Sequence, residues 1–91
     1  MIIHIPTPLR AFTNQQESIS IAASTVAEAL ETLVTQHPEL RPNLFSADGK
    51  LRSFVNLYLN EDDIRYLPAK EASPVTATDE LTIIPSIAGG R

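Results

Sequence analysis

The sequence predicts an α+β fold in which one main helix packs across one face of a mixed sheet of four to five strands. Two observations predict it. Short segments near both ends of the chain alternate polar and apolar residues, and one segment near residue 30 repeats apolar residues at helical spacing. An amphipathic helix must bury its apolar stripe against a neighbouring layer, and the strands can form that layer. With 91 residues, no internal repeat and no linker, the chain reads as one domain.

The first two predicted strands form an antiparallel hairpin. Residues 2–5 are β-branched except for His4, and the strand ends where two prolines remove backbone donors. A polar turn at 13–16 leads into residues 17–22, where polar and apolar residues alternate. Because no second histidine or carboxylate lies near His4 in the sequence, a solvated or hydrogen-bonded histidine is favoured over a ligand there.

The single predicted helix begins at Thr25. Thr25 and Glu28 have the spacing of a capping box, in which each side chain satisfies a backbone N–H that the helix leaves free. The helix ends at His37, because the proline that follows disfavours helical geometry at the residue before it. Its apolar stripe is formed by Val26, Leu30, Leu33 and Val34.

A connector at 39–50 separates the helix from the next strand, at 54–59. Three apolar connector residues are expected to plug one end of the core: Leu40, Leu44 and Phe45. In the strand, alternation places Val55, Leu57 and Leu59 on one face and Phe54, Asn56 and Tyr58 on the other.

The remainder of the chain is expected to be a turn, a short strand, irregular chain and a last strand. The acidic residues at 60–63 read as a solvated turn, since they lack the spaced ligands and the glycine of a calcium loop. A short strand is expected around 64–66, followed by irregular chain that ends in a tight turn at 79–80. Strand periodicity resumes at Leu81.

This order of elements predicts a roll of the β-grasp kind. The residues expected to face the helix are Ile3, Ile5, Ile19, Ile21, Val26, Leu30, Leu33, Val55, Leu57, Leu59, Leu81 and Ile83. The other face of the sheet would carry Phe54, Tyr58 and Ile84, which is more apolar than a solvent face needs and suggests a docking surface. The alternative is that a connector, 39–50 or 67–80, covers this patch.

Composition excludes several classes of function. The chain has no cysteine, so it has no disulfide, thiolate metal site or thiol nucleophile of its own. A net charge of −4 argues against nucleic acid as a partner. There is neither a secretory signal nor an apolar run of about 18 residues, so a cytoplasmic protein without membrane association is expected. No catalytic triad, phosphate loop or metal constellation is evident, and the chain is not expected to be an enzyme.

The chain ends in an unusual way. After the domain, taken as residues 1–84, residues 85–91 form a slim tail that finishes with Gly89, Gly90 and Arg91. Glycine has no Cβ, so such a tail can be drawn out extended, thread a narrow channel in another protein and present a main-chain carboxylate there. The alternatives are an unstructured end or a remnant of expression design.

Three segments carry a resemblance to a known family: IPTPLR at 5–10, RSFVNLYLNEDDIR at 52–65 and TIIPSIAGG at 82–90. With them, the chain resembles the ubiquitin-like sulfur carriers, the family of the molybdopterin-synthase small subunit and the thiamin sulfur carrier. It looks most similar to the sulfur carrier of thiocarboxylate-dependent cysteine synthesis. The middle segment is the most specific, because Gly-Gly ends also occur in unrelated ubiquitin-like proteins.

The resemblance implies a β-grasp carrier whose Gly90 is adenylated by an E1-like enzyme and then converted to a thiocarboxylate. It implies a reactive tail of Ile87, Ala88, Gly89 and Gly90, and a partner-binding face that includes Phe54, Tyr58 and Ile84. The chain itself would bind no cofactor or metal, while partner enzymes would use ATP and a sulfur donor. The sulfur acceptor would belong to a pyridoxal-phosphate cysteine synthase or to the molybdopterin-synthase large subunit.

Arg91 departs from the family pattern, because it ties the Gly90 carbonyl into a peptide bond. In a native chain it would be removed by a zinc-dependent metalloprotease, as the resemblance implies for members with residues beyond the double glycine. Two other roles stay open: a ubiquitin-like modifier that forms isopeptide bonds through Gly90, and a subunit that inserts its tail into a synthase without covalent chemistry.

Overall fold

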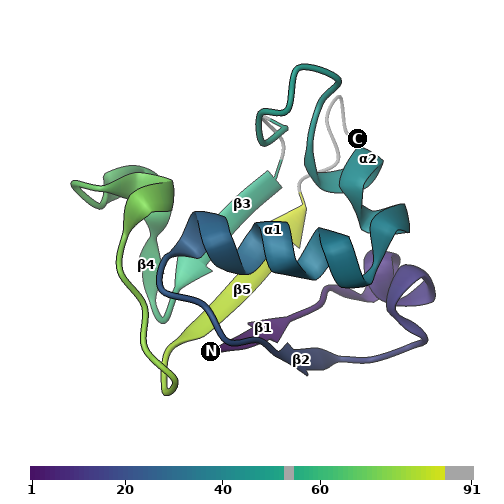
Figure 1. Cartoon of the computed structure of the whole chain (residues 1–91), viewed down its shortest axis with the longest axis horizontal. Helices are drawn as coiled ribbons and strands as arrows, with labels where there is room; N and C mark the ends of the chain where they lie inside the picture. Colours follow the sequence, from purple (N-terminus) through teal and green to yellow (C-terminus); the bar gives the residue numbers. More distant parts are fainter. Residues whose placement is uncertain (53–54, 86–91) are drawn as a thin grey trace.

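The computed structural model of the chain describes residues 1–52 and 55–85. A five-stranded sheet in the order β2-β1-β5-β3-β4 is crossed on one face by helix α1, Val26–Gln36, which confirms the predicted α+β roll (Figure 1). The sheet is mixed, since β1 pairs with β5 in parallel and the other pairs are antiparallel. The strands are β1, Ile2–His4; β2, Ser18–Ser20; β3, Val55–Leu59; β4, Asp62–Asp63; and β5, Glu80–Pro85.

The central strand is the last one in the sequence. In β5, Leu81 lies opposite Ile3 of β1 and also opposite Leu59 of β3. A slip of one residue in the pairing would turn every side chain of β5 to the other face of the sheet. The apolar side chains of the three strands would then leave the core, so their alternation fixes this register. The first half of β5 is therefore held by strands on both sides, and its end, at Pro85, is held by β3.

Helix α1 begins and ends where its sequence predicts. The Thr25 hydroxyl oxygen accepts the backbone N–H of Glu28 at 3.1 Å, and the Glu28 carboxylate accepts the N–H of Ser24 at 2.7 Å. At the other end, the N–H of His37 donates to the Leu33 carbonyl at 2.9 Å and terminates the helix before the proline. Local capping thus sets the length of the helix.

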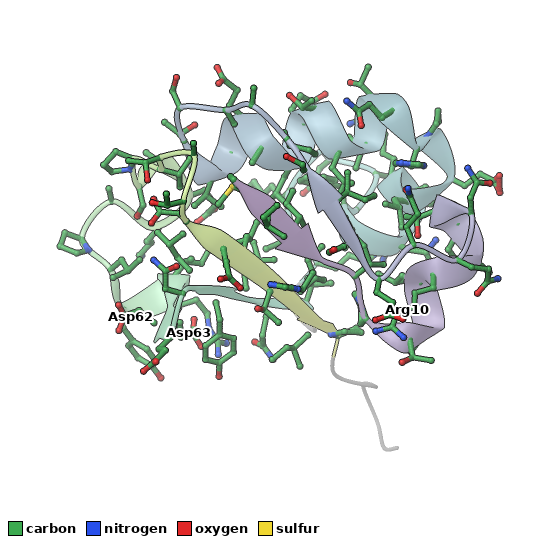
Figure 2. The ribbon with its side chains drawn as sticks, turned by 90° about the horizontal axis from the view of Figure 1, so that it is seen from below. Arg10, Asp62 and Asp63 are labelled. Carbon is green, nitrogen blue, oxygen red and sulfur yellow. The ribbon has the colours of Figure 1, made fainter. Side chains whose placement is uncertain are left out.

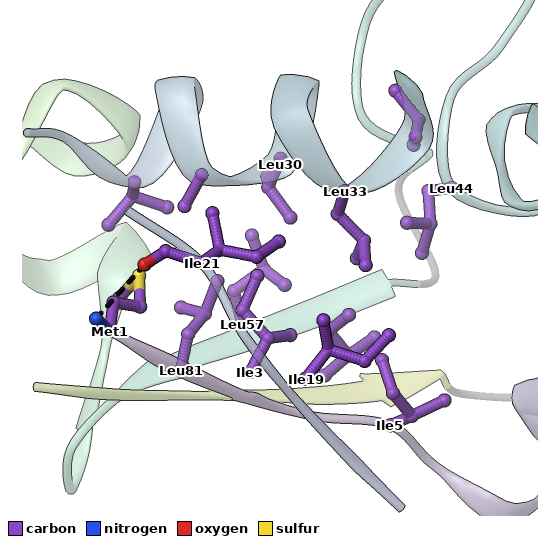
Figure 3. Packing of buried hydrophobic residues seen from close by; sticks show 14 of the residues in the cluster. Met1, Ile3, Ile5, Ile19, Ile21, Leu30, Leu33, Leu44, Leu57 and Leu81 are labelled. Carbon is purple, nitrogen blue, oxygen red and sulfur yellow. Dashed lines mark hydrogen bonds between the residues drawn. The ribbon is translucent and has the colours of Figure 1, made fainter. Parts of the chain in front are cut away.

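The core lies between α1 and the sheet (Figure 3). Every residue expected to face the helix is buried, and so is Met1, whose side chain the sequence did not assign to the core. Leu40 and Leu44 are fully buried and close one end of the core as predicted, while Phe45 is half-buried and packs against it. Period-two and helical alternation therefore identified the inward faces correctly.

The connectors contain short helices that the sequence did not predict. A 3₁₀ helix at Thr7–Thr13 lies between the two strands of the first hairpin, and another at Pro38–Leu40 runs into α2, Arg41–Leu44. Proline stands in the first turn of each, where its missing N–H costs nothing. The strands β1 and β2 are correspondingly shorter than their sequence patterns.

The chain after β3 differs from the expected turn and strand. Asp62 and Asp63 form β4, and the segment expected as a short strand, Ile64–Tyr66, is a 3₁₀ helix. The Asp63 carboxylate accepts the backbone N–H of Arg65 at 2.9 Å, a local bond that competes with strand pairing and favours a helical turn. The acidic segment is not uniformly solvated either, because Asp63 is only 8% exposed.

The segment before β5 contains a 3₁₀ helix at Lys70–Ala72. The tight turn that was expected at 79–80 lies earlier in the chain. The Asp79 carboxylate accepts the N–H of Thr76 at 2.7 Å and closes a turn over residues 76–79, so that Glu80 already belongs to β5. This bond from an aspartate to the backbone is typical of turns. None of the helices in the described part of the chain is long and apolar enough to cross a membrane.

Candidate functional site

The sheet face opposite α1 carries two of the residues predicted to bind a partner. Ile84 of β5 lies beside Asn56 of β3. Two residues earlier in β5, Thr82 lies beside Tyr58 of β3. Ile84 is 44% exposed, so neither connector covers it, while Tyr58 is half-buried. We call Tyr58, Thr82 and Ile84 the outer patch. It ends one residue before Pro85, the last residue of β5.

His4 lies on the same face of the sheet and is hydrogen-bonded. Its Nε2 lies 2.7 Å from the Glu80 carboxylate, across the parallel β1–β5 pair. Both side chains are substantially exposed, at 42% and 58%, so the pair contributes little to stability. The prediction of a satisfied histidine at this position is confirmed, and its partner stands 76 residues away in the sequence.

An ion pair, Asp63–Arg65, lies at the β3–β4 edge of the sheet. Two guanidinium nitrogens of Arg65 contact the Asp63 carboxylate, at 2.8 and 3.2 Å. Hydrogen bonding from the Arg65 side chain and backbone lowers the pKa of Asp63 below its usual value of 3.8. The β3 register places Tyr58 opposite Asp63, so the pair borders the outer patch. Sequence reasoning missed it; the aspartate–x–arginine spacing was the only available signal.

The Asp63–Arg65 pair predicts an acid-dependent loss of stability. A group whose pKa is lowered by folding stabilises the protein above its unfolded pKa and loses this contribution as the pH falls through the folded pKa. We expect Asp63→Asn to lower the melting temperature at pH 7, and the difference from the parent protein to shrink below about pH 4. The exposed neighbour is the matched control: Asp62→Asn should change the melting temperature little at any pH. A difference for Asp63→Asn that persists undiminished at pH 3 would contradict this assignment.

On the helix side, a hollow of about 580 Å³ lies between α1 and the loop that follows α2. Apolar residues such as Leu30, Phe45 and Leu51 line it, together with Glu31, which is already paired with Arg41 at 2.8 Å. Among residues 1–52 and 55–85, no group of three histidine or acidic side chains is placed to hold a metal ion.

The other predicted site residues lie outside the described residues. These are Phe54 of the partner-binding face and the tail residues Ile87, Ala88, Gly89, Gly90 and Arg91. The strand β5 runs to Pro85, one residue into the segment assigned to the tail. The division into a domain at 1–84 and a tail at 85–91 stays a prediction, as do the roles of the tail residues.

The chain is similar in sequence and structure to several small proteins that are known as sulfur carriers or protein modifiers. Sulfur carrier protein CysO of Mycobacterium tuberculosis is 34% identical over 90 residues, which cover 97% of this chain and 96% of the relative. A solved BexX/CysO complex from Amycolatopsis orientalis contains a similar chain, with a TM-score of 0.85, 32% identity and 98% of both chains covered. Crystalline SAMP1 of Haloferax volcanii matches with a TM-score of 0.83, 27% identity, and 99% and 98% of the two chains covered.

The sequence match to a protein family spans nearly the whole folded domain. The ThiS family matches residues 3–90, from β1 through the sheet and helix to the double glycine. Similar β-grasp structures cover nearly the whole chain, so the agreement is not confined to a shared motif. The chain therefore belongs to the ThiS family.

Proposed function

We propose that this protein is a sulfur carrier whose Gly90 carboxylate is adenylated by an E1-like enzyme and then converted to a thiocarboxylate. The observation that carries the proposal is the similarity to CysO, a sulfur carrier protein, over 97% of the chain. The family match also extends to Gly90, the residue that would react.

The chemistry explains why such a carrier needs partner enzymes. A carboxylate is a poor electrophile, so a Gly90 oxygen attacks the α-phosphorus of ATP and expels pyrophosphate. The resulting acyl-adenylate has AMP as a leaving group, and sulfur from a donor replaces it. The product holds a nucleophilic sulfur that stays attached to a protein and cannot diffuse away. ATP and the sulfur donor are substrates of the partner enzymes, and the carrier supplies only its chain end.

The geometry of the domain supports this role. The outer patch includes Ile84, which directly precedes Pro85, the first residue of the predicted tail. A partner that binds the patch is therefore already next to the origin of the tail. The pairing of Pro85 with Val55 of β3 holds that origin in a defined place, which lowers the entropy cost of guiding the chain end into an active site.

Cysteine synthesis is the preferred destination of the sulfur. The acceptor would be an activated serine derivative on a pyridoxal-phosphate enzyme, and molybdopterin synthesis is the alternative. The match to CysO over nearly the full chain supports the first choice. The BexX/CysO complex supports the wider idea that a carrier of this shape works while bound to a partner protein.

Arg91 must be removed before Gly90 can react, because adenylation needs a free carboxylate on that residue. A zinc-dependent metalloprotease is the proposed processing enzyme. The test compares residues 1–90 with residues 1–91 as substrates of the activating enzyme from the same organism, by ATP–pyrophosphate exchange. We expect exchange with the 1–90 form and only background exchange with the 1–91 form. Equal exchange with both forms would contradict the requirement for processing, and no exchange with either would contradict the carrier proposal.

A protein modifier is the second candidate, and the similarity to SAMP1, a small archaeal modifier protein, favours it. A modifier shares the activation step but transfers Gly90 to a lysine of a target protein. Cells expressing the tagged 1–90 form should then contain conjugates of higher mass, which disappear when Gly90 is deleted. Recovery of only free protein and its thiocarboxylate would favour the carrier.

A further inference from the structure

Within the described residues, the side chain of Arg10 makes one hydrogen bond. It lies in the 3₁₀ helix Thr7–Thr13, and its Nε donates to the backbone carbonyl of Ile5 at 3.0 Å. No carboxylate in the described part of the chain pairs with it, whereas the described Arg41 and Arg65 each pair with an acidic residue. The bond through Nε restrains the side chain while its two terminal nitrogens stay available to another acceptor.

The position of Arg10 relates it to the end of β5. His4 lies opposite Thr82 in the parallel β1–β5 pair, so Ile5 comes one residue later, level with Ile83. Figure 2 shows Arg10 towards the end of the sheet at which β5 ends, and Asp62 and Asp63 at the opposite end. In a chain of net charge −4, Arg10 is thus a cation that no described carboxylate pairs with, towards the end of the sheet at which β5 ends.

We propose that Arg10 is a docking residue that pairs with a carboxylate of the activating enzyme at the rim of the channel that receives the tail. This inference rests on the proposed carrier function. A guanidinium matches a carboxylate through two parallel hydrogen bonds, and a side chain that is already restrained loses less entropy when they form. Arginines are also enriched among the residues that dominate protein interfaces.

A carboxylate of the enzyme fits this position better than a phosphate of its ATP. Gly90 lies five residues beyond Pro85. A fully extended segment of that length spans up to about 17 Å. When the tail is drawn into an active site, the adenylate forms at its far end, while Arg10 stays with the domain at the channel entrance. The group that Arg10 meets there belongs to the surface of the partner.

The test measures kcat/KM for adenylation of the 1–90 form at several salt concentrations. For Arg10→Glu and Arg10→Gln we expect a decrease of roughly 30-fold or more, the cost of truncating a buried interfacial charge pair, expressed mainly in the KM for the carrier. Both variants should also show a weaker salt dependence than the parent protein. Lys70→Glu is the matched control: Lys70 is exposed, and the 3₁₀ helix that holds it lies beside the one at Ile64–Tyr66, near β4. We expect Lys70→Glu to have the same kcat/KM for adenylation, and the same salt dependence, as the parent protein.

The outcomes separate this inference from the carrier proposal. If the parent 1–90 form is not adenylated, the carrier proposal itself fails and the inference fails with it. If the parent is adenylated and the Arg10 variants match it, only the docking role is overturned. An equal decrease for Lys70→Glu would indicate a general charge effect, and a raised KM for ATP would place Arg10 at the nucleotide; either result overturns the proposal. Melting temperatures identify a variant that fails to fold, and Arg10→Gln, which adds no negative charge, then serves as the test.

Discussion

Replacing Ile83 with alanine is expected to lower the free energy of unfolding by about 2–5 kcal/mol. Ile83 is 1% exposed and lies in the middle of β5, opposite Leu57 of β3, where both side chains face α1. Removing three carbons from this position forfeits the hydrophobic transfer energy and leaves a cavity that the surrounding strands cannot close. Equilibrium unfolding in urea, monitored by circular dichroism, measures the change.

The next residue is the control for this prediction. Ile84 has the same side chain in the same strand, but it points to the other face and is 44% exposed. We expect Ile84→Ala to change the free energy of unfolding by no more than about 0.5 kcal/mol. A cost for Ile84→Ala as large as that for Ile83→Ala would mean that the two faces of β5 are assigned the wrong way round.

Ile84→Glu is expected to weaken binding to the activating enzyme by about 2–5 kcal/mol, which is roughly 30-fold or more in the dissociation constant. The reason is that a charge placed in the outer patch would be buried without a partner in the complex. The domain itself should stay folded, because Ile84 is in contact with solvent in the free protein. Titration calorimetry gives the affinity, and the melting temperature verifies the fold. Tyr58→Glu is expected to act in the same direction, since Tyr58 belongs to the same patch.

Ser20→Glu is the control variant for this experiment, because it adds the same charge to the same face of the sheet. Ser20 is exposed on β2, on the same face of the sheet as Ile84, and it lies opposite Ile2 with β1 between it and β5. We expect its affinity to stay close to that of the parent protein. If Ser20→Glu weakens binding as much as Ile84→Glu does, the loss reflects added negative charge and the outer patch is not the docking centre.

The main features of the fold could be predicted because their signals are local in the sequence. Alternation at Ile19 and Ile21, and again at Leu57 and Leu59, predicted the buried faces of two strands, since successive side chains of a strand point to opposite sides. The start of α1 could be predicted because Thr25 carries the hydroxyl that caps the helix. Ile84 and Tyr58 were placed on the outer face by the same reasoning, without knowledge of how the strands pair.

The features that escaped prediction depend on contacts or on competition between local structures. The short helices in the connectors were missed because proline was read only as the end of a strand or of a helix, although it also suits a first helical turn. The segment at 64–66 was taken for a strand because Ile64 and Tyr66 fit one. The backbone N–H of Arg65 instead bonds to the Asp63 carboxylate, and the chain turns.

The sequence by itself determined which side chains of the predicted helix and strands face the core, where the helix begins and ends, and that the last strand is followed by a slim Gly-Gly segment. These properties follow from side-chain periodicity and from capping, which act over a few residues. Only the tertiary structure decided that His4 pairs with Glu80, that Asp63 is buried, and that Arg10 lies towards the end of β5 with no described carboxylate as its partner. The physical reason is that strand pairing brings distant residues together: β1 meets β5, and β4 meets β3, and no local pattern encodes which side chains then become neighbours.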